Sequence, residues 1–301
     1  MAYTVDNAII LAAGTSSRFA PLSYERPKAL ITVKGEILIE RQIRQLQQAG
    51  VPEIFVVTGY RSEQLVYLAD KFGVKLVHNP DYGTRNNNAS LYAARRYLGN
   101  SYVCSADNYF CENPFEREVD GCYYAAVYAN GPTQEWCIKT DAAGNICGAT
   151  VGGRDSWYMM GHTFWDTNFS QAFVEILEEV YYRPETAPLL WESIFLQHTD
   201  RLKMKVRQYA PGIIYEFDSL DELRQFDPEY RTNSHSTILR EIAVKWNVPE
   251  EEITGIRALA GQYNDAVGFC FQIKGQAFYY DYFSKEVSQW NENWKKETFP
   301  S

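Results

Sequence analysis

Short apolar runs along the first third of the chain are each followed by a segment whose apolar residues recur at helical spacing. Ala8 to Ala13 form a continuous apolar run that ends at Gly14, as expected for a parallel strand buried on both faces. Apolar residues from Glu36 to Gln48 recur at near-helical spacing, and Gly50 stands just beyond, where a left-handed residue commonly ends a helix. The chain is therefore predicted to open with a strand, a loop rich in glycine and serine, and a helix.

The same alternation continues as far as Asp107. Predicted strands occupy Ile54–Val57, Lys75–His78 and Tyr102–Cys104, and predicted helices occupy Ser62–Phe72 and a segment through Leu91 to Leu98. Strands and helices that alternate at these lengths predict a parallel sheet with right-handed crossovers and a ligand crevice at the carboxyl ends of the strands. Because Gly14 and Asp107 each follow a strand, we expect both at that edge.

The second half of the chain has a different pattern. Strands are expected at Tyr123–Tyr128, Trp136–Thr140 and Ile146–Val151, the last two joined by a hairpin turn over 141–145; helices are expected near Phe169–Tyr182 and Leu189–Gln197, and a strand at Ile213–Phe217. The polar, helix-breaking stretch from Phe226 to Ser236 marks a boundary. We therefore expect an α/β domain over residues 1–230 and a small α+β module over residues 236–301, the latter with a helix at Thr237–Trp246 and two strands around Gly275.

Composition and charge restrict the class of partner. Apolar residues make up 46% of the chain and charged residues 22%, which is ordinary for a folded cytoplasmic protein. The formal charge is -9, and no dense block of basic residues interrupts it, so we expect neither a nucleic-acid nor a membrane partner. The first seven residues lack the features of a secretory signal, and no apolar run approaches the roughly 18 residues of a membrane span. The expected location is the cytoplasm, and a small phosphorylated ligand remains compatible with these numbers.

Cysteine and histidine offer no metal-ligand pattern. The six cysteines lack any C-x-x-C pair, and we expect them to be reduced core thiols. The four histidines share no metal-ligand spacing and are expected to be structural or at the surface.

The most informative segment is the loop after the first strand. It reads L-A-A-G-T-S-S-R-F from Leu11 to Phe19 and continues to R-P-K-A-L at 26–30. Small residues let backbone N–H groups approach phosphate oxygens, Arg18 offers a planar fork of donors, and Lys28 supplies a compact charge. An ordinary surface turn is the alternative for any Gly-Ser loop, and the Pro27-Lys28 element disfavours it. The dinucleotide fingerprint G-x-G-x-x-G is absent, which disfavours a nicotinamide enzyme.

This order of residues closely resembles the nucleotidyltransferase family that activates sugar phosphates and phospho-alcohols, over roughly Ala8 to Phe226. The resemblance implies a mixed, mainly parallel Rossmann-like sheet flanked by helices. It also implies a reaction in which a phosphate attacks the α-phosphorus of a nucleoside triphosphate and releases pyrophosphate. By the same resemblance, Arg18 and Lys28 contact the triphosphate, and the nucleotide also contacts the backbone turn and the end of the Asp107 strand. The residues concerned are Leu11, Ala12, Ala13, Gly14, Ser105 and Ala106.

Asp107 stands directly after an apolar strand, where a polyphosphate crevice is expected. Mg²⁺ prefers a few oxygen ligands and commonly bridges one or two carboxylates to substrate phosphates. The family resemblance implies Asp107 as the first magnesium ligand and Asp218 as the second. Asp218 also suits the N-cap of a helix over Ser219–Phe226, so both roles stay open at this point. No nucleophilic side chain is required, because the acceptor phosphate is itself the nucleophile.

An amide-rich loop precedes the predicted helix at Leu91. Asn86, Asn87 and Ser90 fit the N-N-x-x-S-L pattern and resemble the branch of the family that uses CTP with phosphocholine, in which this loop lies near the nucleotide. Helix capping is the alternative explanation for one of the asparagines.

Tryptophans beside acids recur in the second half. A quaternary ammonium group cannot donate hydrogen bonds and is held by aromatic faces together with a nearby carboxylate. The resemblance to phosphocholine cytidylyltransferases implies acceptor contacts at these positions, although each tryptophan taken alone is as well explained as a core residue. The candidates are Glu135, Trp136, Trp165, Asp166, Tyr182, Trp191, Glu192 and Tyr215; Glu192 stands where aspartate is expected.

The C-terminal module loosely resembles the start of bacterial choline kinases, through Glu252–Ile256, residues 261–265 and Phe269–Tyr279. The sequence ends before a catalytic loop of the H-x-D kind, so we expect a kinase remnant that packs on the enzyme or mediates a homodimer, rather than a working kinase. The run from Tyr279 to Phe283 is equally compatible with plain sheet core.

The expected function is transfer of CMP from CTP to phosphocholine. The alternatives are a nucleotidyltransferase acting on another phospho-alcohol or a sugar 1-phosphate, and a nucleotide-binding sensor or scaffold without turnover.

Overall fold

The computed structural model describes residues 2–260 and 266–290. Its internal contacts divide the chain into two compact units, and this division does not follow chain order. The first unit comprises residues 1–14 and 35–216, and the second comprises residues 15–34 and 217–301. The loop after the first strand therefore belongs with the C-terminal part of the chain, which the sequence pattern did not predict.

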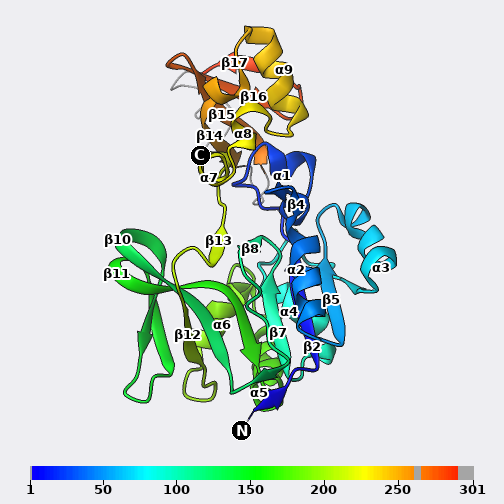
Figure 1. Cartoon of the computed structure of the whole chain (residues 1–301), viewed down its shortest axis with the longest axis vertical. Helices are drawn as coiled ribbons and strands as arrows, with labels where there is room; N and C mark the ends of the chain where they lie inside the picture. The colour runs from blue at the N-terminus through cyan, green and yellow to red at the C-terminus, as the bar shows by residue number, and fades with distance from the viewer. Residues whose placement is uncertain (1, 261–265, 291–301) are drawn as a thin grey trace. The chain divides into compact units, whose positions relative to one another are not determined.

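The first unit is built on a seven-stranded sheet of mixed, mainly parallel strands, which confirms the predicted fold class (Figure 1). Strands β7, β2, β5 and β6 run parallel to one another, whereas β11 is antiparallel to both β7 and β10. In spatial order the strands are β12 (Lys205–Tyr209), β10 (Tyr123–Thr140), β11 (Ile146–Trp165), β7 (Ser101–Ser105), β2 (Asn7–Ala12), β5 (Glu53–Thr58) and β6 (Lys75–His78).

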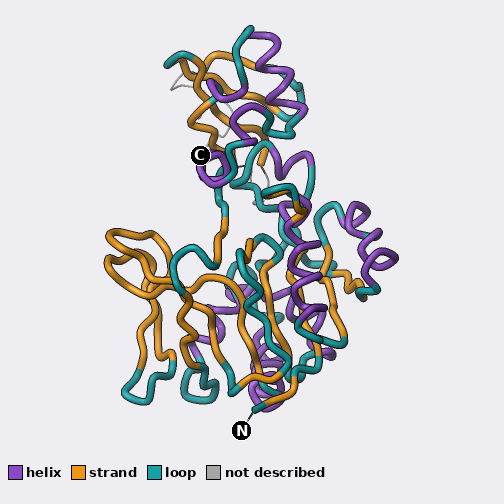
Figure 2. The backbone as a smooth tube through the Cα atoms, viewed as in Figure 1, coloured by secondary structure: helices purple, strands orange, loops and turns teal. Residues whose placement is uncertain are grey.

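The β10–β11 hairpin is longer than the sequence pattern predicted. The two strands expected at 123–128 and 136–140 are one strand of 18 residues, and β11 has 20 residues and continues to Trp165 (Figure 2). Register shifts between Ala129 and Trp136 break the alternation of apolar and polar positions, so one irregular strand resembles two short ones. The predicted turn is confirmed, because Asp141 N–H donates to the carbonyl of Asn145 at 2.9 Å.

Helices cover both faces of this sheet. The larger hydrophobic core gathers residues of α4, α5 and α6 on one face, and α2 lies over the other (Figure 1). Strong amphipathic spacing makes α2 begin near its predicted start, and Gly50 follows it with a φ of 79°. The bounds are α2 (Leu38–Gln48), α3 (Tyr67–Phe72), α4 (Asn88–Ala94), α5 (Thr167–Val180) and α6 (Trp191–Gln197), with 3-10 turns at Ser62–Leu65, Arg95–Tyr97 and Pro184–Thr186.

Short strands complete the first unit. Strand β8 (Asn108–Phe110) pairs antiparallel with β13 (Ile214–Glu216), and β1 (Tyr3–Thr4) pairs antiparallel with β9 (Glu118–Val119); β4 spans Glu36–Ile37. The β8–β13 pair matters for the site because it begins directly after Asp107.

The second unit contains a four-stranded antiparallel sheet, which is more than the two strands predicted. The helix expected at Thr237–Trp246 is confirmed as α9, and Ser236 caps it by accepting from Leu239 N–H at 3.1 Å. The sheet strands are β14 (Thr254–Ala260), β15 (Ala266–Ile273), β16 (Gln276–Asp281) and β17 (Val287–Gln289). The remaining elements are α1 (Leu22–Glu25), β3 (Thr32–Val33), α7 (Leu220–Phe226) and α8 (Glu229–Thr232), with 3-10 turns at Lys28–Leu30 and Glu250–Glu252.

Three further expectations concern the whole chain. Cys104 and Cys137 are buried thiols, but Cys111 and Cys147 are exposed, so the core location predicted for the thiols is wrong for these two. Within the described residues, every helix is too short or too polar to cross a membrane. Residues 261–265, used for the kinase resemblance, lie outside the described residues.

Candidate active site

The turn after β2 and Asp107 lie at the same edge of the sheet. Strands β2 and β7 are parallel neighbours in which Leu11 pairs with Ser105, and Ala106 N–H donates to the Leu11 carbonyl at 3.2 Å. The edge predicted for Gly14 and Asp107 is therefore confirmed, and it is the carboxyl edge at which α/β sheets bind ligands.

The turn at Gly14 is held on one side and open on another. A side chain added at Gly59 would lie 2.7 Å from the Tyr82 ring and 2.9 Å from Ala13, so glycine alone fits beneath the turn. Tyr60 N–H donates to the Ala13 carbonyl at 3.0 Å. By contrast, a Cβ added at Gly14 would meet nothing within 4 Å. The backbone there is accessible to a ligand and rigidly supported.

The second unit brings Arg18, Lys28 and Asp218 together. Arg18 Nη1 lies 3.1 Å from Asp218 Oδ2, and Lys28 Nζ lies 3.6 Å from Asp218 Oδ1. The Lys28 side chain is nearly buried and lies over the Phe19 ring, whereas 78% of the Arg18 side chain is exposed. An exposed ion pair contributes little, about 0–1 kcal/mol, so the Arg18 pair is weak and replaceable by a more highly charged anion.

Asp218 does not cap the helix that follows it. Ser219 holds the N-cap position of α7, and its hydroxyl accepts from Glu222 N–H at 3.2 Å. Glu222 in turn accepts from the backbone N–H of Asp218 at 2.7 Å. The capping alternative raised from sequence is therefore wrong, and the Asp218 carboxylate faces the two cations instead.

Carboxylates gather around two tyrosines near Asp107. Tyr124 donates to Glu192 Oε1 at 3.0 Å, and burial raises the pKa of Tyr124 well above its usual value, with the negative charges of Glu192, Glu216 and Asp107 adding to the effect. Burial also raises the pKa of Tyr158, assisted by the charges of Glu135 and Glu216. We call these two tyrosines and the carboxylates whose charges act on them the acidic-aromatic cluster, which comprises Asp107, Tyr124, Glu135, Tyr158, Glu192 and Glu216.

Sequence reasoning missed Tyr124, Tyr158 and Glu216 in this cluster. Glu216 pairs with Asn108 across the β13–β8 ladder, and Asn108 Nδ2 donates to Glu216 Oε2 at 3.4 Å. Tyr158 falls in the part of β11 that the pattern did not identify as strand. The signal that could have found Glu216 is its place in the strand predicted at Ile213–Phe217, two residues before Asp218.

The three tryptophans have different environments. Trp136 is half-buried at the margin of the larger core, whereas Trp191 is 3% exposed and stacks on Tyr124 with ring centroids 5.7 Å apart. Trp165 has no exposed surface and packs 5.0 Å from Trp191 and 4.8 Å from Phe173. The expectation that Trp165 contacts a ligand is therefore corrected, because its indole is part of the core.

Asp166 is likewise a structural residue. Its carboxylate accepts from Phe169 N–H at 2.8 Å as the N-cap of α5. Trp165, its neighbour, pairs with Ser101 at the start of β7, so both residues lie at the sheet edge opposite Asp107.

The two tyrosines predicted to contact the acceptor, Tyr182 and Tyr215, have different surroundings. Tyr215 pairs with Tyr109 in the β13–β8 ladder, next to Glu216, and belongs near the acidic-aromatic cluster. Tyr182 is 80% exposed, and its hydroxyl lies 3.2 Å from that of Tyr92, in a different aromatic group that also includes Tyr181.

The amide-rich loop binds a neighbouring segment of the same unit. Asn86 Nδ2 donates to the Pro188 carbonyl at 3.0 Å, and Asn88, which is fully buried, donates to the Thr186 carbonyl at 3.1 Å. Ser90 Oγ accepts from Asn79 Nδ2 at 3.2 Å. Asn87 precedes α4 but makes no side-chain cap. These groups join the start of α4 to the segment that leads into α6.

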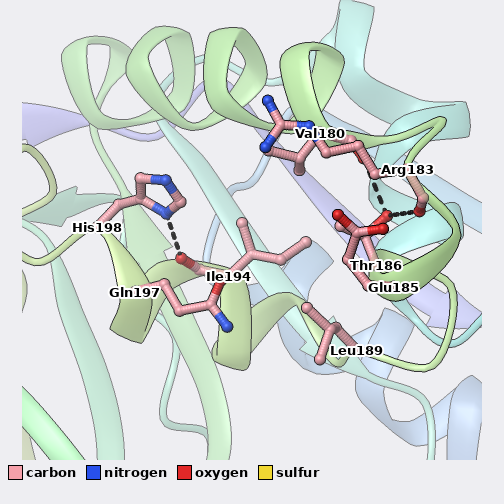
Figure 3. Close-up of a pocket in the computed structure, with 8 residues that line it drawn as sticks. All are labelled: Val180, Arg183, Glu185, Thr186, Leu189, Ile194, Gln197 and His198. Carbon is pink, nitrogen blue, oxygen red and sulfur yellow. Dashed lines mark hydrogen bonds between the residues drawn. The ribbon is translucent and has the colours of Figure 1, made fainter.

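A pocket of about 480 Å³ is lined by residues of α5, of α6 and of the segment that joins these two helices. Figure 3 shows Arg183 and His198 at its rim, with His198 Nδ1 2.8 Å from the Ile194 carbonyl. None of the predicted site residues lines it. Its lining residues are Val180, Arg183, Glu185, Thr186, Leu189, Ile194, Gln197 and His198.

Comparison with known proteins identifies the family to which this fold belongs. Residues 8–119 match the family model of the MobA-like NTP transferase domain. The chain is 34% identical to the choline-phosphate cytidylyltransferase of Streptococcus pneumoniae over 73% of this chain and 96% of that protein. It is also 34% identical to the 2-aminoethylphosphonate cytidylyltransferase of Lancefieldella rimae, over 74% of this chain and 93% of that protein. The solved structure of the pneumococcal CTP:phosphocholine cytidylyltransferase superposes with a TM-score of 0.71 and 34% identity, covering 75% of this chain and 99% of that one.

Proposed function

This chain belongs to the nucleotidyltransferase family of the choline-phosphate cytidylyltransferases, and we propose that it transfers CMP from CTP to phosphocholine, giving CDP-choline and pyrophosphate. The observation that carries the proposal is the position of Asp107. It shares a sheet edge with the open turn at Gly14 and belongs to the acidic-aromatic cluster. This position supports an acceptor site next to the backbone turn that the first unit contributes to the proposed nucleotide site.

The reaction needs alignment more than it needs a reactive side chain. A phosphate oxygen of phosphocholine forms a bond to the α-phosphorus of CTP, and the bond from that phosphorus to the pyrophosphate oxygen breaks. The open backbone from Leu11 to Gly14 would approach the phosphates, and Arg18 and Lys28 would neutralise the charge that passes to pyrophosphate. In the structure both cations face Asp218, so nucleotide binding would exchange a carboxylate for a polyphosphate.

The amide loop and the end of β7 complete the proposed nucleotide contacts. Ser105 and Ala106 lie beside Leu11 at the same sheet edge, which supports their assignment. Asn86, Asn87 and Ser90 each have a protein partner, so any contact with CTP would be additional to their role in holding the loop.

Magnesium is the proposed cofactor, and the residues fit it. No group of three or more potential metal-ligating side chains occurs among residues 2–260 and 266–290. Mg²⁺ keeps several waters and takes one or two carboxylates with substrate phosphates, so a preformed protein cage is not needed. Asp107 is the proposed first ligand, and Asp218 remains the second by family resemblance. The ion would supply charge stabilisation at the phosphates.

The acceptor side of the proposal rests on aromatic faces next to carboxylates. Trp136 and Tyr215 are half-buried, and each is next in the chain to a carboxylate of the acidic-aromatic cluster, Glu135 and Glu216 respectively. Each well-placed cation–π contact contributes roughly 0.5–2 kcal/mol, and the carboxylates add ordinary attraction. Trp191 would hold Tyr124 in place rather than contact the acceptor directly, because it stacks on Tyr124 and is itself nearly buried.

A primary ammonium acceptor is the second candidate. The relative from Lancefieldella rimae, named for 2-aminoethylphosphonate, is as similar to this chain as the pneumococcal one. A primary ammonium group donates hydrogen bonds, and the cluster of carboxylates would accept them. The half-buried faces of Trp136 and Tyr215 favour the quaternary group, which cannot donate.

A panel of substrates decides between these readings. Pyrophosphate release would be followed for each nucleoside triphosphate with phosphocholine, phosphoethanolamine, 2-aminoethylphosphonate and glucose 1-phosphate, with Mg²⁺ present. We expect the highest kcat/KM for CTP with phosphocholine. Turnover of another acceptor but not phosphocholine would overturn the acceptor assignment, and CTP binding without pyrophosphate release from any pair would favour a nucleotide sensor.

A further inference from the structure

The loop that carries Arg18 and Lys28 is held by the C-terminal module. By its contacts, the loop from Thr15 to Lys34 belongs to the second unit, together with everything after Phe217. The alignment that spans 96% of the pneumococcal relative covers 73% of this chain, so about a quarter of the chain lies outside it. The stretch after α7, residues 227–301, has about that length, and it comprises the C-terminal module together with the short segment that leads into it. The contacts between loop and module are therefore a feature of this chain that needs a physical role.

Glu25 makes the most specific of these contacts. Its Oε1 accepts from the backbone N–H groups of Thr237 at 2.7 Å and Ile238 at 3.4 Å, at the start of α9. These N–H groups have no partner within the helix, and a carboxylate next to them also interacts favourably with the helix dipole. Glu25 therefore acts as a second cap of α9, in addition to Ser236, and joins the loop to the module three residues before Lys28.

Two neighbours of Glu25 strengthen the attachment. Arg26 Nη2 donates to the His235 carbonyl at 2.9 Å. The Tyr24 ring stacks on the Tyr282 ring with centroids 3.7 Å apart and an interplanar angle of 6°. Stacked aromatic pairs stabilise a contact beyond the effect of the area that they bury.

The loop is also held on the other side of Lys28. Tyr230 donates its hydroxyl hydrogen to the Thr32 carbonyl at 2.5 Å, and Lys34 N–H donates to Asp227 Oδ2 at 2.7 Å. Lys28 thus lies between two attachments, and neither attachment uses the lysine itself.

The helix next to Asp218 is fixed to the same module. Arg224 in α7 is nearly buried and donates to the Ile253 carbonyl at 2.7 Å and the Glu250 carbonyl at 2.8 Å. Asp218, Arg18 and Lys28 are therefore all positioned by one body of structure, the second unit.

We propose that the C-terminal module is a positioning element: it holds Arg18 and Lys28 as a pre-arranged pair for the nucleotide. Glu25 is the principal attachment of the module to the loop. The inference rests on the proposed function for the identity of the nucleotide. A loop that is ordered before binding loses less conformational entropy when the triphosphate arrives, so its attachment strengthens CTP binding without contacting CTP.

The test compares Glu25→Ala, Glu25→Gln and Glu241→Ala in the full chain. Glu241 is an exposed acid in the second turn of α9, beyond the N–H groups that Glu25 contacts, which makes it the control for charge. We expect Glu25→Ala to weaken the Kd for CTP, measured by calorimetry, roughly tenfold, because CTP must then order a loop that the wild type holds in place before binding. Glu25→Gln keeps an oxygen acceptor for Thr237 N–H and should restore most of the affinity, and Glu241→Ala should match the wild type.

Kinetics provide the second measurement. Glu25→Ala should raise the KM for CTP while leaving the KM for phosphocholine within about twofold of the wild-type value, because the acceptor cluster lies in the first unit. Unchanged CTP affinity in a folded Glu25→Ala variant would overturn the proposal, as would equal effects on both substrates. Tyr282→Leu, which removes the ring stack, repeats the test if Glu25→Ala does not fold. If the wild-type chain binds CTP but turns over no acceptor, the proposed function fails on its own. The positioning proposal is then still tested by the calorimetric comparison of CTP affinity among the variants.

Discussion

Asn87 fixes the position of Glu192 from 105 residues away, since its Nδ2 donates to Glu192 Oε2 at 3.2 Å. The carbonyl oxygen of the same side chain accepts from Trp191 N–H at 2.7 Å. One amide therefore holds both the start of α6 and the carboxylate that Tyr124 also contacts. We predict that Asn87→Ala raises the KM for phosphocholine about three- to tenfold, as expected for about 1 kcal/mol of lost hydrogen bonding. Asn113→Ala is the control, because Asn113 donates to the Gln45 carbonyl and not to Glu192; an equal effect of both would contradict this role for Asn87.

Asp107→Asn should remove nearly all magnesium-dependent turnover. The change keeps the size of the side chain and removes the charge that a bound cation requires, so kcat should fall on the order of 100-fold or more. Thermal unfolding should stay close to that of the wild type, because Asp107 lies in a half-buried turn. Full pyrophosphate release by Asp107→Asn would exclude this carboxylate as a required ligand.

Trp136→Ala and Trp165→Ala should have opposite signatures. Trp136 is half-buried and follows Glu135 of the acidic-aromatic cluster in the chain, so its loss should raise the KM for phosphocholine and leave the KM for CTP nearly unchanged. Trp165 is fully buried, and its truncation should lower the free energy of unfolding by about 3–5 kcal/mol. Urea denaturation and steady-state kinetics on both variants make the comparison. A stable Trp165→Ala variant with weakened phosphocholine binding would restore Trp165 as a ligand contact.

Acceptor affinity should depend on the ionisation of Glu192. Burial raises the pKa of this carboxyl above its usual value, although hydrogen bonds from Asn87 and Tyr124 oppose the shift. A choline group favours the ionised form, so phosphocholine binding should weaken as the pH falls from neutrality toward that raised pKa. Glu192→Gln should bind more weakly at neutral pH and lose this part of the pH dependence. Comparing the two proteins removes the contribution from the phosphate of the ligand, and identical pH profiles would exclude Glu192 as the titrating group.

His162 should make the fold less stable in mild acid. It is fully buried, its Nε2 lies 2.8 Å from the Tyr123 hydroxyl, and burial lowers its pKa to about 3, with the positive charge of Arg207 adding to the effect. Below about pH 6.5 the unfolded chain gains a proton at His162 that the folded chain does not, so stability falls as the pH drops from 6.5 toward 3. From pH 7 to pH 5 the stability difference between the wild type and His162→Gln should change by about 2 kcal/mol against the wild type. A difference that is constant over this range would show that His162 titrates normally.

Local sequence determined the alternating half of the fold. Continuous apolar runs and helix-ending glycines are local signals, each contained within a few residues of the chain. For this reason β6 and α9 occur at their predicted bounds. The shared edge of Gly14 and Asp107 followed from the direction of the parallel strands. The same reasoning stopped at β10 and β11, where bulges break the alternation and one strand resembles two.

Sequence by itself determined the family, the sheet and the types of residue at the site, because motif order and periodicity are local properties of the chain. Tertiary structure decided which candidates share a site. Trp136 and Trp165 look alike in sequence, yet the register of β11 against β7 buries Trp165 at the opposite edge. Glu25, Tyr24 and Arg26 carry no recognisable signal, because their partners lie more than 200 residues away, at Thr237, Tyr282 and His235. Contacts over such separations depend on how the packed elements meet, and no pattern along the chain encodes that directly.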